Sequence, residues 1–338
     1  MHGQQLELPK LTIWEIHMKR LLPVLVAAFS IAAAQGAPGE LHDVGGHSLH
    51  MYCTGEAAST PTVILDAGLG DWSLQMRNLQ DEVSDFARVC SYDRAGYGWS
   101  EPGPQPRTSD VLVDELVALL AASGEQGPYL FVGHSFGGAN MIGLAHDHPE
   151  LTAGVLLLDA SHPEQLERLA EVPALLLLQD MEIEGLAQLS LAAAAGELGA
   201  ADVMEMVPAG VPEELHDVWA EQFLHSGSLQ AAVDEYDSID ASLEWVGERY
   251  DLGDLPLGVV ARDAGISLPP EILEALGINQ ADLDRAEEIW RDMQLENAAL
   301  STNSRFEVAE ASPHYVHYFQ LGLVTDLLHG LIDANAAF

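Results

Sequence analysis

Short apolar runs alternate with amphipathic segments through most of the chain. Unbroken apolar runs are typical of strands that are buried on both faces of a sheet, whereas half-buried strands alternate apolar and polar residues. The segments between the runs favour helices. This alternation predicts an α/β fold, with a mostly parallel central sheet flanked by helices. The expected strands are 61–66, 89–92, 128–132, 154–158, 255–261 and 306–309, preceded by a hairpin over 41–54.

One long segment interrupts the alternation. From about 161 to 253, alanine, leucine, glutamate and methionine dominate and strand candidates are few. We interpret this segment as a helical cap inserted into a core formed by residues 37–160 and 254–338. The expected core helices are 71–87, with Asp71 as its N-cap, 108–120, 139–145, 270–300 and 316–332.

The N-terminal region has the layout of a secretory signal peptide. Met18-Lys19-Arg20 precedes an apolar run over 21–34, which ends in the small residues Ala32-Ala33-Ala34. The run is shorter than the about 20 residues that a membrane span needs. We therefore predict that 1–36 is an extension and signal peptide, that the mature chain is secreted or periplasmic, and that it has no stable membrane insertion. An uncleaved anchor or a buried helix is the alternative, and either Met1 or Met18 can be the start.

The charge of the chain is strongly negative. There are 53 Asp and Glu against 13 Lys and Arg, which gives a formal net charge of −40. The only lysines are Lys10 and Lys19. Such a surface repels phosphate backbones and anionic lipids, so it argues against binding to nucleic acid. A further hypothesis is adaptation to salt, because counter-ions would relieve the self-repulsion.

The most informative motif is Gly133-His134-Ser135-Phe136-Gly137. It follows the apolar run 128–132 and precedes a helical segment. Glycines at both ends allow a sharp turn that exposes the Ser135 hydroxyl. The same turn places the Phe136 N–H at a helix N-terminus, where it can face a developing oxyanion. The context favours Ser135 as a nucleophile over an ordinary strand-to-helix turn.

Four motifs in this order resemble the α/β-hydrolase superfamily. They are Val-Ile-Leu-Asp-Ala-Gly-Leu-Gly at 63–70, Tyr-Asp-Arg-Ala-Gly-Tyr-Gly-Trp-Ser at 92–100, the serine turn at 133–138, and Glu-Ala-Ser-Pro-His-Tyr at 310–315. Ala67 stands where this superfamily often has histidine. The resemblance implies the α/β-hydrolase fold with a helical cap and a serine hydrolase reaction, and it does not specify the substrate.

The resemblance also implies roles for individual residues. His314 would be the base that takes the Ser135 proton, with His317 as a less favoured alternative. Leu69 and Phe136 would donate their backbone N–H groups to the oxyanion. Asp93 and Arg94 look catalytic, but we interpret them as residues that tie the glycine-rich loop.

The acid of the triad has two candidates. The chain order of the superfamily is Ser, then Asp or Glu, then His. Asp159 ends the strand after the serine helix, and Asp263 follows the strand after the cap but lies two positions earlier than the usual register. We favour Asp159, with Asp263 as the alternative; a cap for the following turn is the structural role open to Asp159.

Cys53 and Cys90 are the only cysteines. In the usual sheet of this superfamily they would fall at the same end of two neighbouring strands, so the resemblance makes a disulfide plausible in an exported protein; two buried thiols are the alternative. No spacing of cysteine and histidine suggests a metal site, and His146-Asp147-His148 is better explained as a solvated helix end. No cofactor motif is found.

The combined expectation is a serine hydrolase that cleaves an ester or related acyl compound, a small-molecule substrate, through an acyl-enzyme. The alternatives are an aminopeptidase-like or amide hydrolase of the same fold, and a non-catalytic ligand-binding relative. A Ser at 135 argues against dehalogenase or epoxide hydrolase chemistry, in which this position is usually Asp. The oligomeric state stays open.

Overall fold

The structure is a computed structural model that describes residues 37–56, 61–225 and 227–336. The signal peptide that we expect within 1–36 lies outside these residues. Among the described helices, none is long and apolar enough to cross a membrane.

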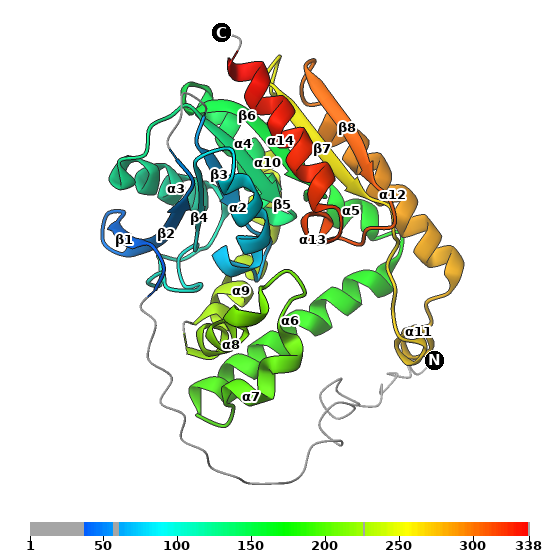
Figure 1. The fold of residues 1–338 in the computed structure, drawn as a ribbon. Helices are drawn as coiled ribbons and strands as arrows, with labels where there is room; N and C mark the ends of the chain where they lie inside the picture. The colour runs from blue at the N-terminus through cyan, green and yellow to red at the C-terminus, as the bar shows by residue number, and fades with distance from the viewer. Residues whose placement is uncertain (1–36, 57–60, 226, 337–338) are drawn as a thin grey trace. The chain divides into compact units, whose positions relative to one another are not determined.

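An eight-stranded sheet forms the centre of the fold, in the order β1-β2-β4-β3-β5-β6-β7-β8 (Figure 1). The first hairpin pairs antiparallel, and β2 also runs antiparallel to β4, while the remaining neighbours are parallel. This confirms the predicted mostly parallel sheet. The strands are β1 (Glu40–Asp43), β2 (Ser48–Thr54), β3 (Val63–Asp66), β4 (Val89–Tyr92), β5 (Tyr129–His134), β6 (Thr152–Leu158), β7 (Leu257–Arg262) and β8 (Ser304–Ala309).

The central strands are buried on both faces, which explains their unbroken apolar sequences. In β5, Phe131 packs into the apolar cluster on one face, and Leu130 and Val132 pack into the cluster on the other. Helices α3 (Ser109–Ser123) and α4 (Phe136–Asp147) supply the first cluster. Helices α2 (Arg77–Ser84) and α14 (Leu321–Ala336) supply the second (Figure 1).

Two expected helices differ from the structure in their details. The helix expected over 270–300 is divided into α11 (Pro270–Leu276) and α12 (Gln280–Ala298). Gly277 adopts a left-handed conformation with φ of +68° and ends α11, and the Asn279 side chain then caps α12. Asp71 is not a helix cap. A 3₁₀ turn (Ser73–Met76) precedes α2, and the N-cap of this turn is Trp72.

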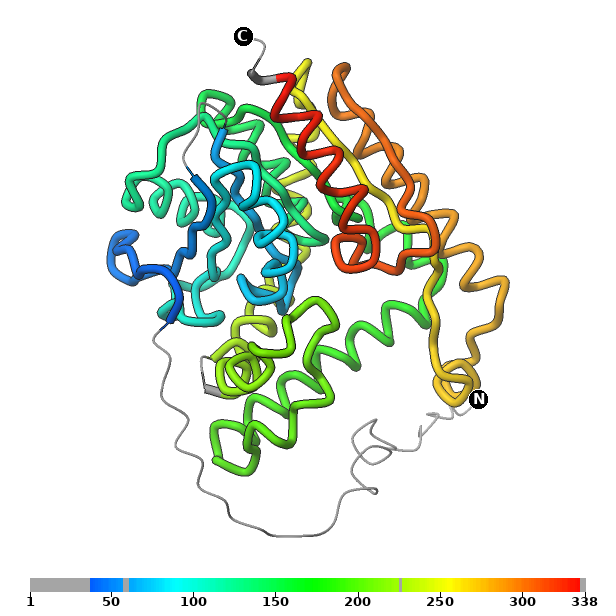
Figure 2. Tube along the Cα trace, viewed as in Figure 1, coloured from blue at the N-terminus to red at the C-terminus, as the bar shows by residue number. Residues whose placement is uncertain are grey.

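Between β6 and β7 the chain leaves the sheet and forms helices only, as Figure 2 traces in green and yellow-green. Trp219 and Phe223 of α8 stack with Trp72 of the core, and α9 packs against α6 and α8. The last helix, α10, lies instead against the core helices α3 and α4. The helices are α5 (Gln165–Leu169), α6 (Pro173–Ala194), α7 (Ala200–Val203), α8 (His216–His225), α9 (Ser228–Asp237) and α10 (Ile239–Gly247).

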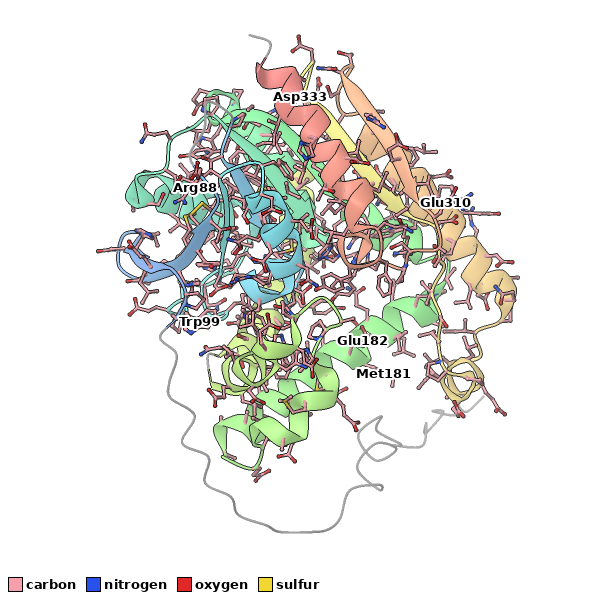
Figure 3. All side chains as sticks on the ribbon, in the orientation of Figure 1. Arg88, Trp99, Met181, Glu182, Glu310 and Asp333 are labelled. Carbon is pink, nitrogen blue, oxygen red and sulfur yellow. A yellow bond between two sulfur atoms is a disulfide. The ribbon has the colours of Figure 1, made fainter. Side chains whose placement is uncertain are left out.

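Cys53 of β2 and Cys90 of β4 are directly opposite in the antiparallel pair and form a disulfide. Their Cα atoms are 4.0 Å apart. The yellow bond lies beside Arg88 in Figure 3. The bridge ties the strand that leads out of the first hairpin to the parallel part of the sheet.

Candidate active site

Ser135 occupies a strained turn between β5 and α4. Its φ is 52° and its ψ is −121°, a conformation that residues with a side chain rarely adopt. The flanking glycines are required sterically: a Cβ on Gly133 would lie 2.5 Å from the Gly137 carbonyl oxygen, and one on Gly137 would lie 2.5 Å from that of Ala67. The Ser135 N–H donates to the Leu158 carbonyl, which ties the turn to β6. The half-buried Ser135 side chain therefore stands at the carboxyl end of the sheet.

The structure brings His314 and Asp159 together. His314 lies in the loop between β8 and α13 (Val316–Phe319), and its Nδ1 donates to Asp159 Oδ2 at 2.6 Å. Since Nδ1 carries this hydrogen, Nε2 is the atom that can accept another proton. His134, the neighbour of Ser135 in the chain, packs against the His314 ring with 4.6 Å between centroids. Its Nε2 donates to the His314 carbonyl oxygen at 3.2 Å.

Asp159 is fully buried after the end of β6, and three donors besides His314 hold its carboxylate. Trp290 Nε1 and the Arg262 backbone N–H donate to Oδ1 at 2.8 and 3.1 Å. The Arg262 guanidinium lies 3.2 Å from Oδ2. Burial opposes ionisation, but the hydrogen bond and charge of His314, with the Arg262 and Trp290 contacts, outweigh it and keep the pKa of Asp159 below its usual value.

Asp263, the alternative acid, is exposed to solvent. Its backbone N–H donates to the Ser312 carbonyl at 3.2 Å. This contact fixes the loop that carries His314, whereas the imidazole itself is bonded to Asp159.

His317 is brought near the site but in a different environment. It is buried in α13, and within the described residues neither ring nitrogen has a hydrogen-bond partner. Burial, and then the charge of His314, lower its pKa to about 3. A histidine with such a pKa is a poor proton acceptor at neutral pH. Its ring instead packs edge-on against His134, with 4.7 Å between centroids.

The loop that carries Leu69 borders the serine. A Cβ on Gly68 would lie 3.3 Å from the Ser135 Cβ. Within the described residues, the backbone N–H groups of Leu69 and Phe136 make no hydrogen bond. An oxyanion hole requires two backbone donors that are free of other partners.

Asp71, beside this loop, is a buried carboxyl that the sequence did not mark as part of the site. Burial raises its pKa to about 6, opposed by a hydrogen bond from Tyr315 and by the charge of Arg94. Tyr315 follows His314 in the chain. Glu182, midway along α6 (Figure 3), also acts on this tyrosine, because the charges of Asp71 and, more weakly, Glu182 raise the Tyr315 pKa.

Asp93 and Arg94 have different roles. Asp93 does tie the glycine-rich loop, as expected: its carboxylate accepts from the backbone N–H groups of Ser73 and Trp99 at 2.9 and 3.0 Å. Arg94 instead contacts the loop that carries Leu69.

The described residues offer little to a metal ion. His162, Glu164 and Glu296 have potential ligand atoms within 4.8 Å of one another. However, the Arg168 guanidinium already bridges the two carboxylates and lies 2.7 Å from each. The positive charge between these two carboxylates is thus supplied by Arg168.

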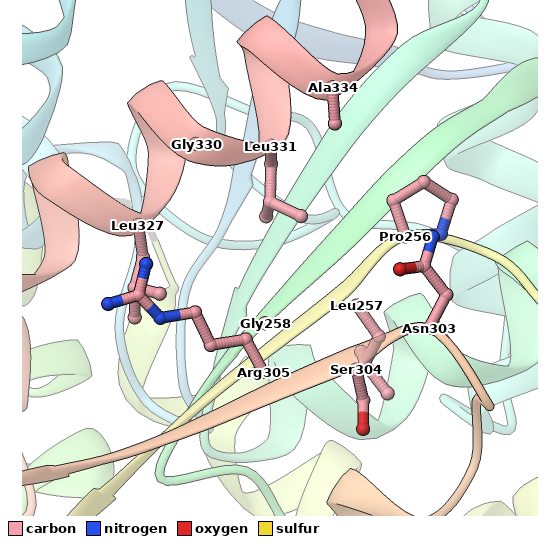
Figure 4. Close-up of a pocket in the computed structure, with 10 residues that line it drawn as sticks. All are labelled: Pro256, Leu257, Gly258, Asn303, Ser304, Arg305, Leu327, Gly330, Leu331 and Ala334. Carbon is pink, nitrogen blue, oxygen red and sulfur yellow. The ribbon is translucent and has the colours of Figure 1, made fainter.

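A pocket lies at the opposite end of the sheet from Ser135 (Figure 4). It is formed by the start of β7, the start of β8 and one side of α14. Because His314 and Asp159 follow the carboxyl ends of their strands, this pocket is separate from the candidate site.

The strand order, the strained serine turn and the later Asp and His loops define the α/β-hydrolase class. The family model described as alpha/beta hydrolase fold matches residues 61–193. The enol-lactonase of Burkholderia xenovorans LB400 superposes with a TM-score of 0.56 at 20% identity, covering 86% of this chain and 100% of that one. The chain therefore has the α/β-hydrolase fold.

Curated relatives match only in part. The chain is 27% identical over 134 residues to the uncharacterized protein YbdG of Bacillus subtilis, covering 40% of this chain and 41% of that protein. It is 40% identical over 84 residues to lipase LipV of Mycobacterium tuberculosis, covering 25% and 31%. The chain spans less than half the length of each curated relative that it matches.

Proposed function

We propose that the protein is a serine hydrolase that cleaves an ester or related acyl compound, a small-molecule substrate, through an acyl-enzyme. The observation that carries the proposal is the 2.6 Å contact between His314 Nδ1 and the buried Asp159 carboxylate, at the same end of the sheet as the strained Ser135. A serine hydroxyl is a weak nucleophile and needs such an oriented base.

In the proposed reaction, Ser135 Oγ attacks the acyl carbon while His314 Nε2 takes its proton. Asp159 holds the imidazole and stabilises the imidazolium. The N–H groups of Leu69 and Phe136 bind the oxyanion of the tetrahedral intermediate. That intermediate collapses to the acyl-enzyme, and His314 returns the proton to the leaving group. Water, deprotonated by His314, then attacks the acyl group, and His314 returns that proton to Ser135 Oγ as the acyl bond breaks. No cofactor takes part.

One observation favours a second candidate, hydrolysis of an acyl substrate that carries an amine. Glu182 is solvent-accessible, yet surrounding protein raises its pKa, and its charge acts on Tyr315 next to His314. A carboxylate in that position suits a cationic group of an aminoacyl amide or ester.

The proposed location is outside the cytoplasm, secreted or periplasmic. Two features support it: the apolar run over 21–34 and the Cys53–Cys90 disulfide, since disulfides persist in oxidising compartments. N-terminal sequencing of exported protein tests it. A mature chain that begins near Gln35 is the expected result, and retention of residues 18–34 would contradict it.

The test of the activity is labelling of the purified protein by a fluorophosphonate, with Ser135→Ala and His314→Ala alongside. We expect the wild type alone to be labelled, and hydrolysis of p-nitrophenyl esters to follow the same pattern. Labelling of Ser135→Ala equal to that of the wild type would contradict the assignment of Ser135 as the nucleophile. A folded wild type with neither labelling nor hydrolysis would favour a non-catalytic ligand-binding role.

A further inference from the structure

Arg94 is buried, and all five N–H groups of its guanidinium are used. Nη1 donates to Asp66 Oδ1 at 2.8 Å and to the Ala67 carbonyl at 2.7 Å. Nη2 donates to the Gly68 carbonyl at 2.8 Å and to Glu235 Oε2 at 2.9 Å, and Nε donates to Glu235 Oε1 at 2.7 Å. A planar guanidinium with every donor engaged has one orientation only.

Two of these acceptors are carbonyls of the loop that presents Leu69. On the other side of Leu69, the Gly70 N–H donates to the Tyr97 hydroxyl at 3.2 Å. The Tyr97 hydroxyl in turn donates to Glu235 Oε2 at 2.9 Å. Both sides of Leu69 are thus held by side chains that bond to the same carboxylate.

Glu235 comes from α9, which lies between β6 and β7 in the segment expected to form the cap. This helix is seated directly on the glycine-rich loop: the Gly98 N–H donates to Ser228 Oγ at 3.2 Å, and a Cβ on Gly96 would lie 2.9 Å from the Ala231 Cβ. The Glu235 carboxylate therefore reaches the core at a fixed place.

We propose that Glu235 is a positioning residue for the oxyanion hole, through which the seating of α9 sets the direction of the Leu69 N–H. The inference rests on the proposed hydrolase function. Without the Glu235 carboxylate, Arg94 loses two of its five hydrogen bonds and Tyr97 loses its acceptor. The two side chains that bond the Gly68 carbonyl and the Gly70 N–H are then no longer held in one orientation. An oxyanion donor stabilises the transition state more than the bound substrate, so its displacement lowers kcat rather than raising KM.

The test is Glu235→Gln, which keeps the shape of the side chain. We expect kcat for a p-nitrophenyl ester to fall about 10- to 100-fold, within the range for loss of one oxyanion donor, while KM changes less than about threefold. Tyr97→Phe removes only the hydroxyl and should lower kcat in the same sense by a smaller factor. If Glu235→Gln does not fold, the kcat of Tyr97→Phe tests the proposal in its place.

The matched control is Glu115→Gln. Glu115 forms the same kind of buried pair with Arg107, with both oxygens 2.7 Å from the guanidinium, but this pair makes no contact with the Leu69 loop. We expect kcat to stay at the wild-type value there. An equal fall of kcat in Glu115→Gln, or a change confined to KM in Glu235→Gln, would overturn the proposal.

Hydrogen exchange over 66–72 gives a readout that needs no activity. We expect faster exchange of this segment in Glu235→Gln than in Glu115→Gln. Unchanged exchange with unchanged kcat would refute the role of Glu235 while leaving the hydrolase proposal intact. A wild type that fails to react with the fluorophosphonate would refute the hydrolase proposal, and the exchange result would still decide whether Glu235 holds the loop.

Discussion

Asp159 and His314 are 155 positions apart in the chain, and their side chains meet at 2.6 Å. The contact is possible because β6 and β8 are both parallel neighbours of β7, so the residues that follow their carboxyl ends lie at one edge of the sheet. Asp159 itself has a φ of 45°, a conformation that residues with a side chain rarely adopt.

Asp159→Asn should abolish most of the activity. An amide cannot hold the Nδ1–H tautomer or stabilise the imidazolium, so we expect kcat/KM for an ester to fall about 10³- to 10⁴-fold. Asp263→Asn is the matched control, because Asp263 is exposed and should leave kcat/KM within about twofold. Steady-state kinetics of the two variants check this, and the reverse pattern would assign the acid to Asp263.

The sequence predicts the elements of this site that lie at strand ends. Ser135 and Asp159 each follow a buried apolar run, and His314 follows the last strand candidate, so the strand pattern indicates which edge of the sheet they share. The contact of Asp159 with Trp290 is different, because Trp290 lies 131 residues away and its position depends on how α12 packs. No spacing along the chain encodes that packing.

Glu235 is a second residue whose contact cannot be predicted from the sequence. Arg94 stands in a recognisable loop, but its partner is 141 residues away, in a segment with many acids. Only the packing of α9 against the core distinguishes this carboxylate from the others.

The end of α11 at Gly277 is also not predictable from the local sequence, because a glycine inside a helical pattern is tolerated in some helices and ends others.

Asp71 should make stability depend on pH. Its pKa is raised from 3.8 to about 6 in the folded protein, so the native state binds more protons than the unfolded chain between these values. The free energy of unfolding should therefore fall as pH rises from about 4 to 6, by at most about 3 kcal/mol for two pKa units.

Urea unfolding of the wild type and Asp71→Asn between pH 4 and 8 measures this. The variant should be the more stable at pH 8 and should show a smaller slope between pH 4 and 6. Parallel curves for the two proteins would show that another group is responsible.

The disulfide should contribute substantially to stability. Cys53 and Cys90 are separated by 37 positions, and closing a loop of that length lowers the entropy of the unfolded chain by the equivalent of about 4 kcal/mol. Reduction should lower the melting temperature of the wild type. The Cys53→Ser/Cys90→Ser protein should melt at the reduced temperature whether or not a reductant is present, and a melting temperature equal to that of the oxidised wild type would contradict the expectation.

Salt should stabilise the protein, since a formal charge of −40 repels itself more strongly in the folded than in the unfolded state. Screening within about 10 Å is reached near 0.1 M salt, so most of the rise in melting temperature should occur between low salt and a few tenths molar. Melting curves in sodium chloride, with sucrose as an uncharged control for solute effects, distinguish screening from general exclusion. A melting temperature that is constant over this range would remove the basis for adaptation to salt.

The variant Glu182→Gln distinguishes an amine-bearing substrate from a neutral ester. If an amine of the substrate binds it, Glu182→Gln should raise KM for an aminoacyl p-nitroanilide about tenfold, in keeping with the loss of one partly desolvated ion pair, and leave KM for a neutral ester unchanged. Glu184→Gln is the control, because Glu184 is an exposed acid on the same helix and the substitution removes the same charge. Equal effects of the two variants on both substrates would mean that only the net charge of α6 matters. The proposal of an amine-bearing substrate would then fail, while the serine hydrolase mechanism at Ser135 would stand.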